Sequence, residues 1–196
     1  SSNCSDHSEQ NQYHHQQQEK YFVDEFLKAV PGRFKRFFLK HFVGWFNRKL
    51  DRHIPKEYLL EIYGSSLANT KEYNFIAPPY LRVLNYHAAH DIAHALNDYQ
   101  LVGCTSFAAR GSKTYDGNII SGRNFDFYSG DDFAKTKLLS FIEPSNGHKF
   151  ASYSWPGFSG VVSGMNVEGI TITMNAAKSE LPTSSKVPIS LLGREI

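Results

Sequence analysis

The chain has 196 residues and a net charge of +2, with 41% hydrophobic and 20% charged residues. These values are typical of a globular protein with one sizeable core, and the small charge argues against nucleic-acid binding. No run approaches the ~20 apolar residues of a membrane span. The two cysteines, Cys4 and Cys104, lie in a polar and an apolar segment respectively, which argues against a disulfide framework.

The first 18 residues are rich in Ser, Asn, Gln and His and show no hydrophobic periodicity. We therefore predict a disordered leader over residues 1–18. This polar start fits the remnant of a removed signal peptide as well as a cytoplasmic tail, so it leaves the compartment open. From Tyr21 to Val30 apolar residues recur at helical spacing, and Pro31-Gly32 ends the predicted helix.

The next segment combines aromatic and basic residues. Aromatic side chains recur at steps of three and four between Phe34 and Phe46, and basic residues fill much of the remaining surface. This pattern predicts a basic, aromatic amphipathic helix. Packing against the strands is the favoured interpretation of its apolar face. The alternative is contact with a membrane surface through residues 33–50.

The rest of the chain changes from a helical to a strand pattern after Gln100. We expect one helix after Pro55 and another over about residues 80–99. The expected strands are residues 104–108, 119–125, 138–142, 149–154, 160–165 and 170–175, and a last helix begins near residue 188. Asp116-Gly117 predicts one hairpin turn, and Asn166-Val167-Glu168-Gly169 predicts another between the last two strands. Helices followed by antiparallel strands indicate an α+β fold.

Cys104 is the main candidate for a reactive group. Gly103 precedes it and lets the backbone bend so that the thiol can reach the preceding carbonyl. The predicted hairpin returns Arg123 and Asp126 beside it. A cation near sulfur favours the thiolate, and a carboxylate can hold a protonated amine. The simpler alternatives are an inert core cysteine and a structural ion pair.

Two ordered blocks resemble a known family. Cys104 is followed by the strand Arg123-Asn124-Phe125-Asp126, and a second block runs from Gly164 to Asn175. Both are similar to segments of the N-terminal nucleophile (Ntn) hydrolases of the choloylglycine hydrolase and penicillin acyltransferase group. The resemblance implies an αββα sandwich, of which residues 104–196 would supply an incomplete half. Residues 19–103 would then be a helical pro-region.

The resemblance also implies a chemistry. Cys104 would attack the carbonyl of Gly103, cut its own chain and leave an α/β heterodimer. The new terminal Cys104 would be the nucleophile, Arg123 would support its thiolate, Asp126 would orient its amine and Asn175 would donate to the oxyanion. The expected reaction is hydrolysis or transfer of the acyl group of a linear N-acyl amide through a thioester, without a cofactor. A non-catalytic truncated homologue and a membrane-associated binding module are the alternatives.

Three histidines raise the question of a metal site. His87, His90 and His94 would share one face of the predicted helix, at spacings that can ligate a metal. No set of Asp, Glu or Cys partners accompanies them. We therefore favour packing or surface roles for these histidines and predict no metal site.

Overall fold

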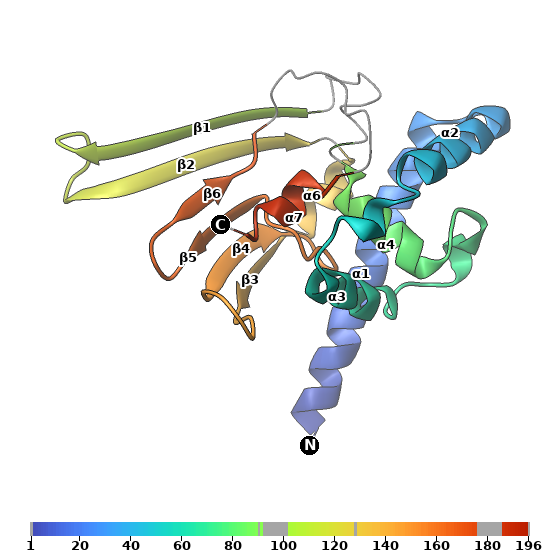
Figure 1. Cartoon of the computed structure of the whole chain (residues 1–196), viewed down its shortest axis with the longest axis horizontal. Helices are drawn as coiled ribbons and strands as arrows, with labels where there is room; N and C mark the ends of the chain where they lie inside the picture. The colour runs from blue at the N-terminus through green and yellow to red at the C-terminus, as the bar shows by residue number, and fades with distance from the viewer. Residues whose placement is uncertain (1, 90, 92–101, 128, 176–185, 196) are drawn as a thin grey trace.

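The computed structural model describes residues 2–89, 91, 102–127, 129–175 and 186–195, and these form an α+β fold. The helices are α1 (Ser2–Ala29), α2 (Arg33–Phe46), η1 (Leu50–Arg52), α3 (Lys56–Ser66), η2 (Glu72–Phe75), α4 (Pro79–His87), α6 (Asp131–Lys135) and α7 (Ile189–Leu192). The strands are β1 (Val102–Gly111), β2 (Gly117–Phe127), β3 (Leu138–Ile142), β4 (Phe150–Ser154), β5 (Ser163–Asn166) and β6 (Thr171–Thr173). Helices α1 to α4 gather on one side of the molecule and the strands on the other (Figure 1).

The long helix α1 differs from the predicted disordered leader over residues 1–18. Its Gln, Glu and Lys residues are good helix formers. The sequence did not indicate a helix here because these residues form no apolar stripe. Its C-terminal half is also held by packing, because His15, Gln18 and Glu19 are all buried. Helix stability here comes from tertiary contacts that periodicity does not reveal.

A buried ion pair anchors α1 to α4. Arg82 Nε donates to Glu19 Oε1 at 2.7 Å, and both side chains are 1% exposed. The remaining partners satisfy both groups: Arg82 also donates to the carbonyl of Ala77 at 2.6 Å, and the backbone N–H of Thr70 donates to Glu19 Oε2 at 3.2 Å. A buried pair is tolerated when its other donors and acceptors are satisfied in this way.

The core of the helical part lies between α3 and α4. Pro55 and Pro78 precede the two helices at the positions predicted for helix starts. Their apolar faces meet in one cluster, to which α7 adds a fully buried Leu191 from the far end of the chain. Helix α4 ends at His87, and residues 90 and 92–99 of the predicted helix lie outside the described residues.

Helix α2 forms where the sequence predicted it, but its aromatic face does not pack against the strands. Phe34 is 76% exposed, and Phe37, Phe38 and Trp45 are each more than half exposed. The expected core packing of this helix is therefore wrong. The helix is tethered through polar contacts instead, because Arg36 donates to the carbonyls of Leu27 and Val30 and Lys40 to that of Phe75.

The strands form two antiparallel sheets in the described chain. Strands β1 and β2 form a long hairpin, and the other sheet has the order β3-β4-β5-β6. Both hairpins predicted from turn residues are present: Gly117 and Gly169 adopt positive φ angles, which glycine adopts without strain. Helix α6 was not predicted, since its five residues are too few for a periodic pattern.

The four-stranded sheet has two unlike faces. Ser152 and Ser154 on one face are buried. The opposite face carries Leu139, Phe141 and Tyr153, which are 54%, 82% and 49% exposed. An antiparallel sheet commonly buries one face only, but its open face is then usually polar.

Aromatic contacts join the helices to the sheet. Phe22 of α1 packs on Tyr86 of α4 with ring centroids 4.8 Å apart. Phe133 of α6 lies 4.9 Å from Trp155, which follows β4, and Trp155 lies 5.8 Å from Phe125 of β2. Such contacts contribute about 0.5–1.5 kcal/mol each beyond burial. These contacts link the helices to the strands around the cavity described below.

Replacing Glu19 by Gln tests the buried pair. The change leaves the Arg82 charge buried without its counter-ion, so we expect a loss of about 3 kcal/mol or more in the free energy of unfolding, measured by urea denaturation. Asp132→Asn breaks the exposed pair with Lys135 and serves as the control, with no measurable shift expected. Equal effects of the two substitutions would contradict the anchoring role.

Candidate active site

The hairpin register places Cys104 and Arg123 on one face. Cys104 pairs with Phe125, and Ser106 pairs with Arg123. Because side chains alternate between the faces of a strand, Cys104, Arg123 and Phe125 point to the same side of the hairpin. Cys104 is a half-buried residue with a free thiol.

Arg123 is held in place by several contacts. Its Nη1 donates to Ser163 Oγ at 2.8 Å, its Nη2 donates to the carbonyl of Met174, and its guanidinium lies 4.2 Å from the centre of the Phe125 ring. Burial lowers the pKa of Arg123, and the negative charge and hydrogen bonding of a Cys104 thiolate oppose that shift. Among the described residues its buried Nε has no hydrogen-bond partner, which leaves one N–H for an anion.

Asp126 lies on the other face of the hairpin. It pairs with Gly103, and a Cβ placed on that glycine would be 3.3 Å from Asp126 Oδ2. Glycine at 103 therefore lets the carboxylate lie against the peptide that precedes Cys104. Asn124 steadies the carboxylate, because its Nδ2 donates to Asp126 Oδ1 at 2.7 Å. Arg123 and Asp126 thus flank the Gly103–Cys104 segment from opposite faces.

Asn175 follows β6 and is exposed. Its amide donates to Thr173 Oγ1 at 3.0 Å, which is a local contact at the end of the strand. The preceding residue, Met174, accepts the hydrogen bond from Arg123, so the end of β6 and the hairpin meet at this point. The expected oxyanion role of Asn175 remains a prediction.

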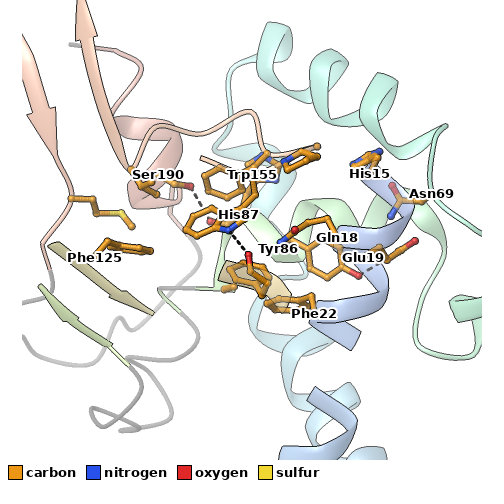
Figure 2. Close-up of a pocket in the computed structure, with 17 residues that line it drawn as sticks. His15, Gln18, Glu19, Phe22, Asn69, Tyr86, His87, Phe125, Trp155 and Ser190 are labelled. Atoms are coloured by element: carbon orange, nitrogen blue, oxygen red, sulfur yellow. Dashed lines mark hydrogen bonds between the residues drawn. The ribbon is translucent and has the colours of Figure 1, made fainter. Parts of the chain in front are cut away.

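A largely apolar cavity with an empty volume of about 720 Å³ lies between the helices and the strands. Figure 2 shows Phe125 at one end and Asn69 at the other, with Trp155 and His87 between them. Phe125 belongs to the same hairpin face as Cys104, so the cavity adjoins the face that carries Cys104.

His87 has a structural role. Its Nε2 accepts from the backbone N–H of Ser159 at 2.9 Å, so its Nδ1 carries the proton and donates to the carbonyl of Val83 at 2.8 Å. Both ring nitrogens are occupied, which agrees with the favoured structural role. His90 and His94 lie outside the described residues, and the described ones contain no cluster of three or more metal-ligating side chains.

Several residues of the site were not predicted. Ser163 and Met174 hold Arg123, but neither carries a local signal for that role. His15, Gln18 and Glu19 line the cavity from the segment around the expected leader. The run of helix-forming residues over 9–20 is the signal that could have revealed them.

Comparison with known proteins gives no function. No family model and no solved structure matches the chain. A curated protein from Archaeoglobus fulgidus, described as "Uncharacterized protein", is 40% identical over 81 residues. The match covers 41% of this chain and only 13% of that protein.

The buried His87 makes stability depend on pH. Burial lowers its pKa to about 4, whereas the unfolded imidazole has a value of 6.5. Only the unfolded chain takes up a proton as the pH falls from 6.5 to about 4, so the folded state loses stability across this window. We measure the free energy of unfolding by urea denaturation for wild type and for His87→Gln. We expect the difference between the two to fall by about 3 kcal/mol from neutral pH to pH 4.

One other buried group acts in the opposite direction. Burial raises the pKa of Asp91 to about 6, so protonation of Asp91 favours the folded state as the pH falls. Asp91 is present in both proteins, and its contribution cancels from the difference. A difference that stays constant with pH would contradict the neutral state assigned to His87.

Proposed function

We propose that the chain carries the catalytic site of a self-activating cysteine Ntn amidohydrolase or acyltransferase. The observation that carries this proposal is the arrangement at Cys104, with Arg123 on the side of the sulfur and Asp126 against Gly103. A buried cysteine of the core needs neither group. A cysteine that cuts the peptide before it and then uses its own amine needs both.

The proposed activation is an acyl shift from nitrogen to sulfur. Cys104 Sγ attacks the carbonyl carbon of Gly103, the Gly103–Cys104 amide bond breaks, and the nitrogen takes up a proton to become a free α-amine. Water then hydrolyses the thioester, which releases the Gly103 carboxylate and restores the thiol. Arg123 stabilises the sulfur as an anion before attack, and Asp126 holds the new amine.

The proposed turnover uses the same atoms on a second amide. The α-amine, whose ordinary pKa is about 8, takes the thiol proton as sulfur attacks the carbonyl of an N-acyl amide. The protonated amine then donates to the leaving nitrogen, and an acyl thioester remains on Cys104. Water or an acceptor amine removes the acyl group. Asn175 is the proposed donor to the tetrahedral oxyanion, an interaction typically worth ~3–4 kcal/mol.

The apolar cavity supports the proposal that the site recognises the acyl group of its substrate. Phe125, Trp155 and Phe133 present aromatic surface next to the hairpin face that carries Cys104. Burying an acyl chain there excludes water and contributes about 25 cal/mol for each Å² of apolar area.

The open face of the four-stranded sheet supports the finer fold assignment. An αββα sandwich packs two sheets face to face, and each inner face is then apolar. The exposed Leu139, Phe141 and Met165 share one face of the β3–β6 sheet and give it this character. We propose that this face is the inner layer of such a sandwich.

Self-cleavage is tested by mass spectrometry under denaturing conditions. We expect two polypeptides, one ending at Gly103 and one beginning at Cys104, and a single chain for Cys104→Ala. Arg123→Met should slow cleavage by roughly tenfold or more, because the cation beside the thiolate is lost. Arg110→Met, at an exposed position of the same hairpin, is the matched control and should cleave normally.

The result that excludes self-processing is a wild-type chain that stays intact at every pH tested. In that case the non-catalytic homologue becomes the better account. A thiol-directed probe would then label Cys104 at the rate of an ordinary cysteine, with no difference between wild type and Arg123→Met.

The exposed aromatic face of α2 favours a second activity, contact with an anionic membrane surface. Phe34, Phe37 and Phe38 form an aromatic cluster, with Phe34 and Phe38 ring centroids 5.0 Å apart. Residues 33–50 contain no Asp or Glu and seven Lys, Arg or His residues. Apolar surface bordered by positive charge is typical of helices that lie in a lipid headgroup layer. None of the described helices is long and apolar enough to span a membrane.

Vesicle co-sedimentation tests this surface. The protein should bind vesicles that contain phosphatidylglycerol, bind less at high salt and bind neutral phosphatidylcholine vesicles weakly. Phe34→Ser with Phe38→Ser should weaken binding tenfold or more. Phe141→Ser removes an even more exposed ring from the sheet and should bind normally. Failure to bind at any lipid charge would remove the membrane proposal.

A further inference from the structure

One end of the apolar cavity carries unsatisfied polar groups. Gln18 of α1 is 6% exposed, and its Oε1 accepts from the hydroxyl of Thr136. Its buried Nε2 has no hydrogen-bond partner in the described chain, nor has either amide atom of Asn69. Gln18 and Asn69 line the same cavity, at the end away from Phe125 (Figure 2).

These groups differ from the satisfied network beside them. Glu19 lines the same region, but both of its oxygens accept hydrogen bonds, from Arg82 and from Thr70. A buried polar group without a partner destabilises a fold by about 1–3 kcal/mol, so native proteins retain few of them. Three such atoms on two residues that line one cavity indicate a place where a ligand completes the hydrogen bonding.

The charge of this wall defines the ligand group. Arg82 neutralises Glu19, and burial lowers the pKa of His15, so His15 is neutral near pH 7. The unpartnered atoms are two amide nitrogens, which donate, and Asn69 Oδ1, which accepts. A ligand group that matches them is neutral, accepts hydrogen bonds and donates one. A hydroxyl is the smallest group with these properties.

We propose that the Gln18–Asn69 end of the cavity selects an acyl chain that carries a hydroxyl group remote from its carbonyl. This inference rests on the proposed function, because it identifies the substrate class of the same site. The carbonyl lies at the Phe125 end, beside the face of Cys104, and the aromatic wall contacts the chain. Gln18 and Asn69 donate to the hydroxyl oxygen, and the hydroxyl hydrogen is donated to Asn69 Oδ1.

The cavity is built from both sides of the proposed cleavage point. Gln18 and Asn69 precede Gly103, whereas Phe125 and Trp155 follow Cys104. Neither product chain contains the whole site. Binding therefore requires that the two chains stay together after cleavage.

Fluorescence of Trp155 gives a binding assay that does not depend on catalysis. The chain has two tryptophans, Trp45 on α2 and Trp155 in the cavity wall, so Trp45→Phe leaves emission from the cavity alone. Adding Cys104→Ala prevents any reaction. The probes are decanamide and ω-hydroxydecanamide, which differ only in the terminal hydroxyl, and each is titrated while Trp155 emission is followed.

We expect the hydroxylated probe to bind roughly tenfold or more tightly than decanamide, as one or two buried hydrogen bonds predict. Asn69→Leu and Gln18→Leu should each abolish most of this preference while leaving decanamide binding unchanged or tighter. Gln16→Leu is the matched control, since Gln16 lies on the same helix and donates to the carbonyl of Ala68 outside the cavity.

Equal affinity of the two probes for the Trp45→Phe, Cys104→Ala protein, or a preference that survives both leucine substitutions in it, would overturn the inference. The same holds if neither probe changes Trp155 emission. Failure of the proposed function looks different. The chain would then remain uncleaved and inactive while the hydroxyl preference and its loss in the variants are still observed.

Discussion

The position of the candidate nucleophile depends on the side chain of Arg123. In the described chain, β1 and β2 pair with each other alone, and an isolated two-stranded hairpin is marginally stable. Arg123 links this hairpin to the second sheet through Ser163 and Met174 and stacks on Phe125. The same guanidinium faces Cys104. A single cation therefore positions the hairpin and supplies the charge that a thiolate requires.

Strand alternation divides the site between two faces. The face with Cys104, Arg123 and Phe125 leads to the cavity, while the face with Gly103 and Asp126 lies along the peptide bond before the cysteine. In the proposed reaction, sulfur chemistry takes place on the first face and amine chemistry on the second. Both depend on one pairing register, because a shift by one residue would exchange the faces.

Two buried polar clusters occupy neighbouring places and have different roles. The Glu19–Arg82 pair is satisfied on all sides and joins α1 to α4, so its role is structural. Gln18 and Asn69 line the cavity and keep unpartnered amide atoms, so their proposed role is ligand binding. The first cluster positions the second, since Gln18 and Glu19 are neighbours on α1. A stable anchor is what allows an unsatisfied group to persist beside it.

The sequence by itself determined most of the local elements, including the hairpin that returns Arg123 and Asp126 beside Cys104. Asp116-Gly117 and Gly169 specify turns through backbone geometry, and a period of two fixes which side chains share a strand face. The tertiary structure alone decided the rest. Helix α1 is anchored by the Glu19–Arg82 pair, whose residues lie 63 positions apart, and the aromatic face of α2 lies open although its pattern suits a core. The cavity likewise joins residues from distant segments. Local patterns record backbone preferences, whereas burial and charge pairing depend on partners that only folding brings together.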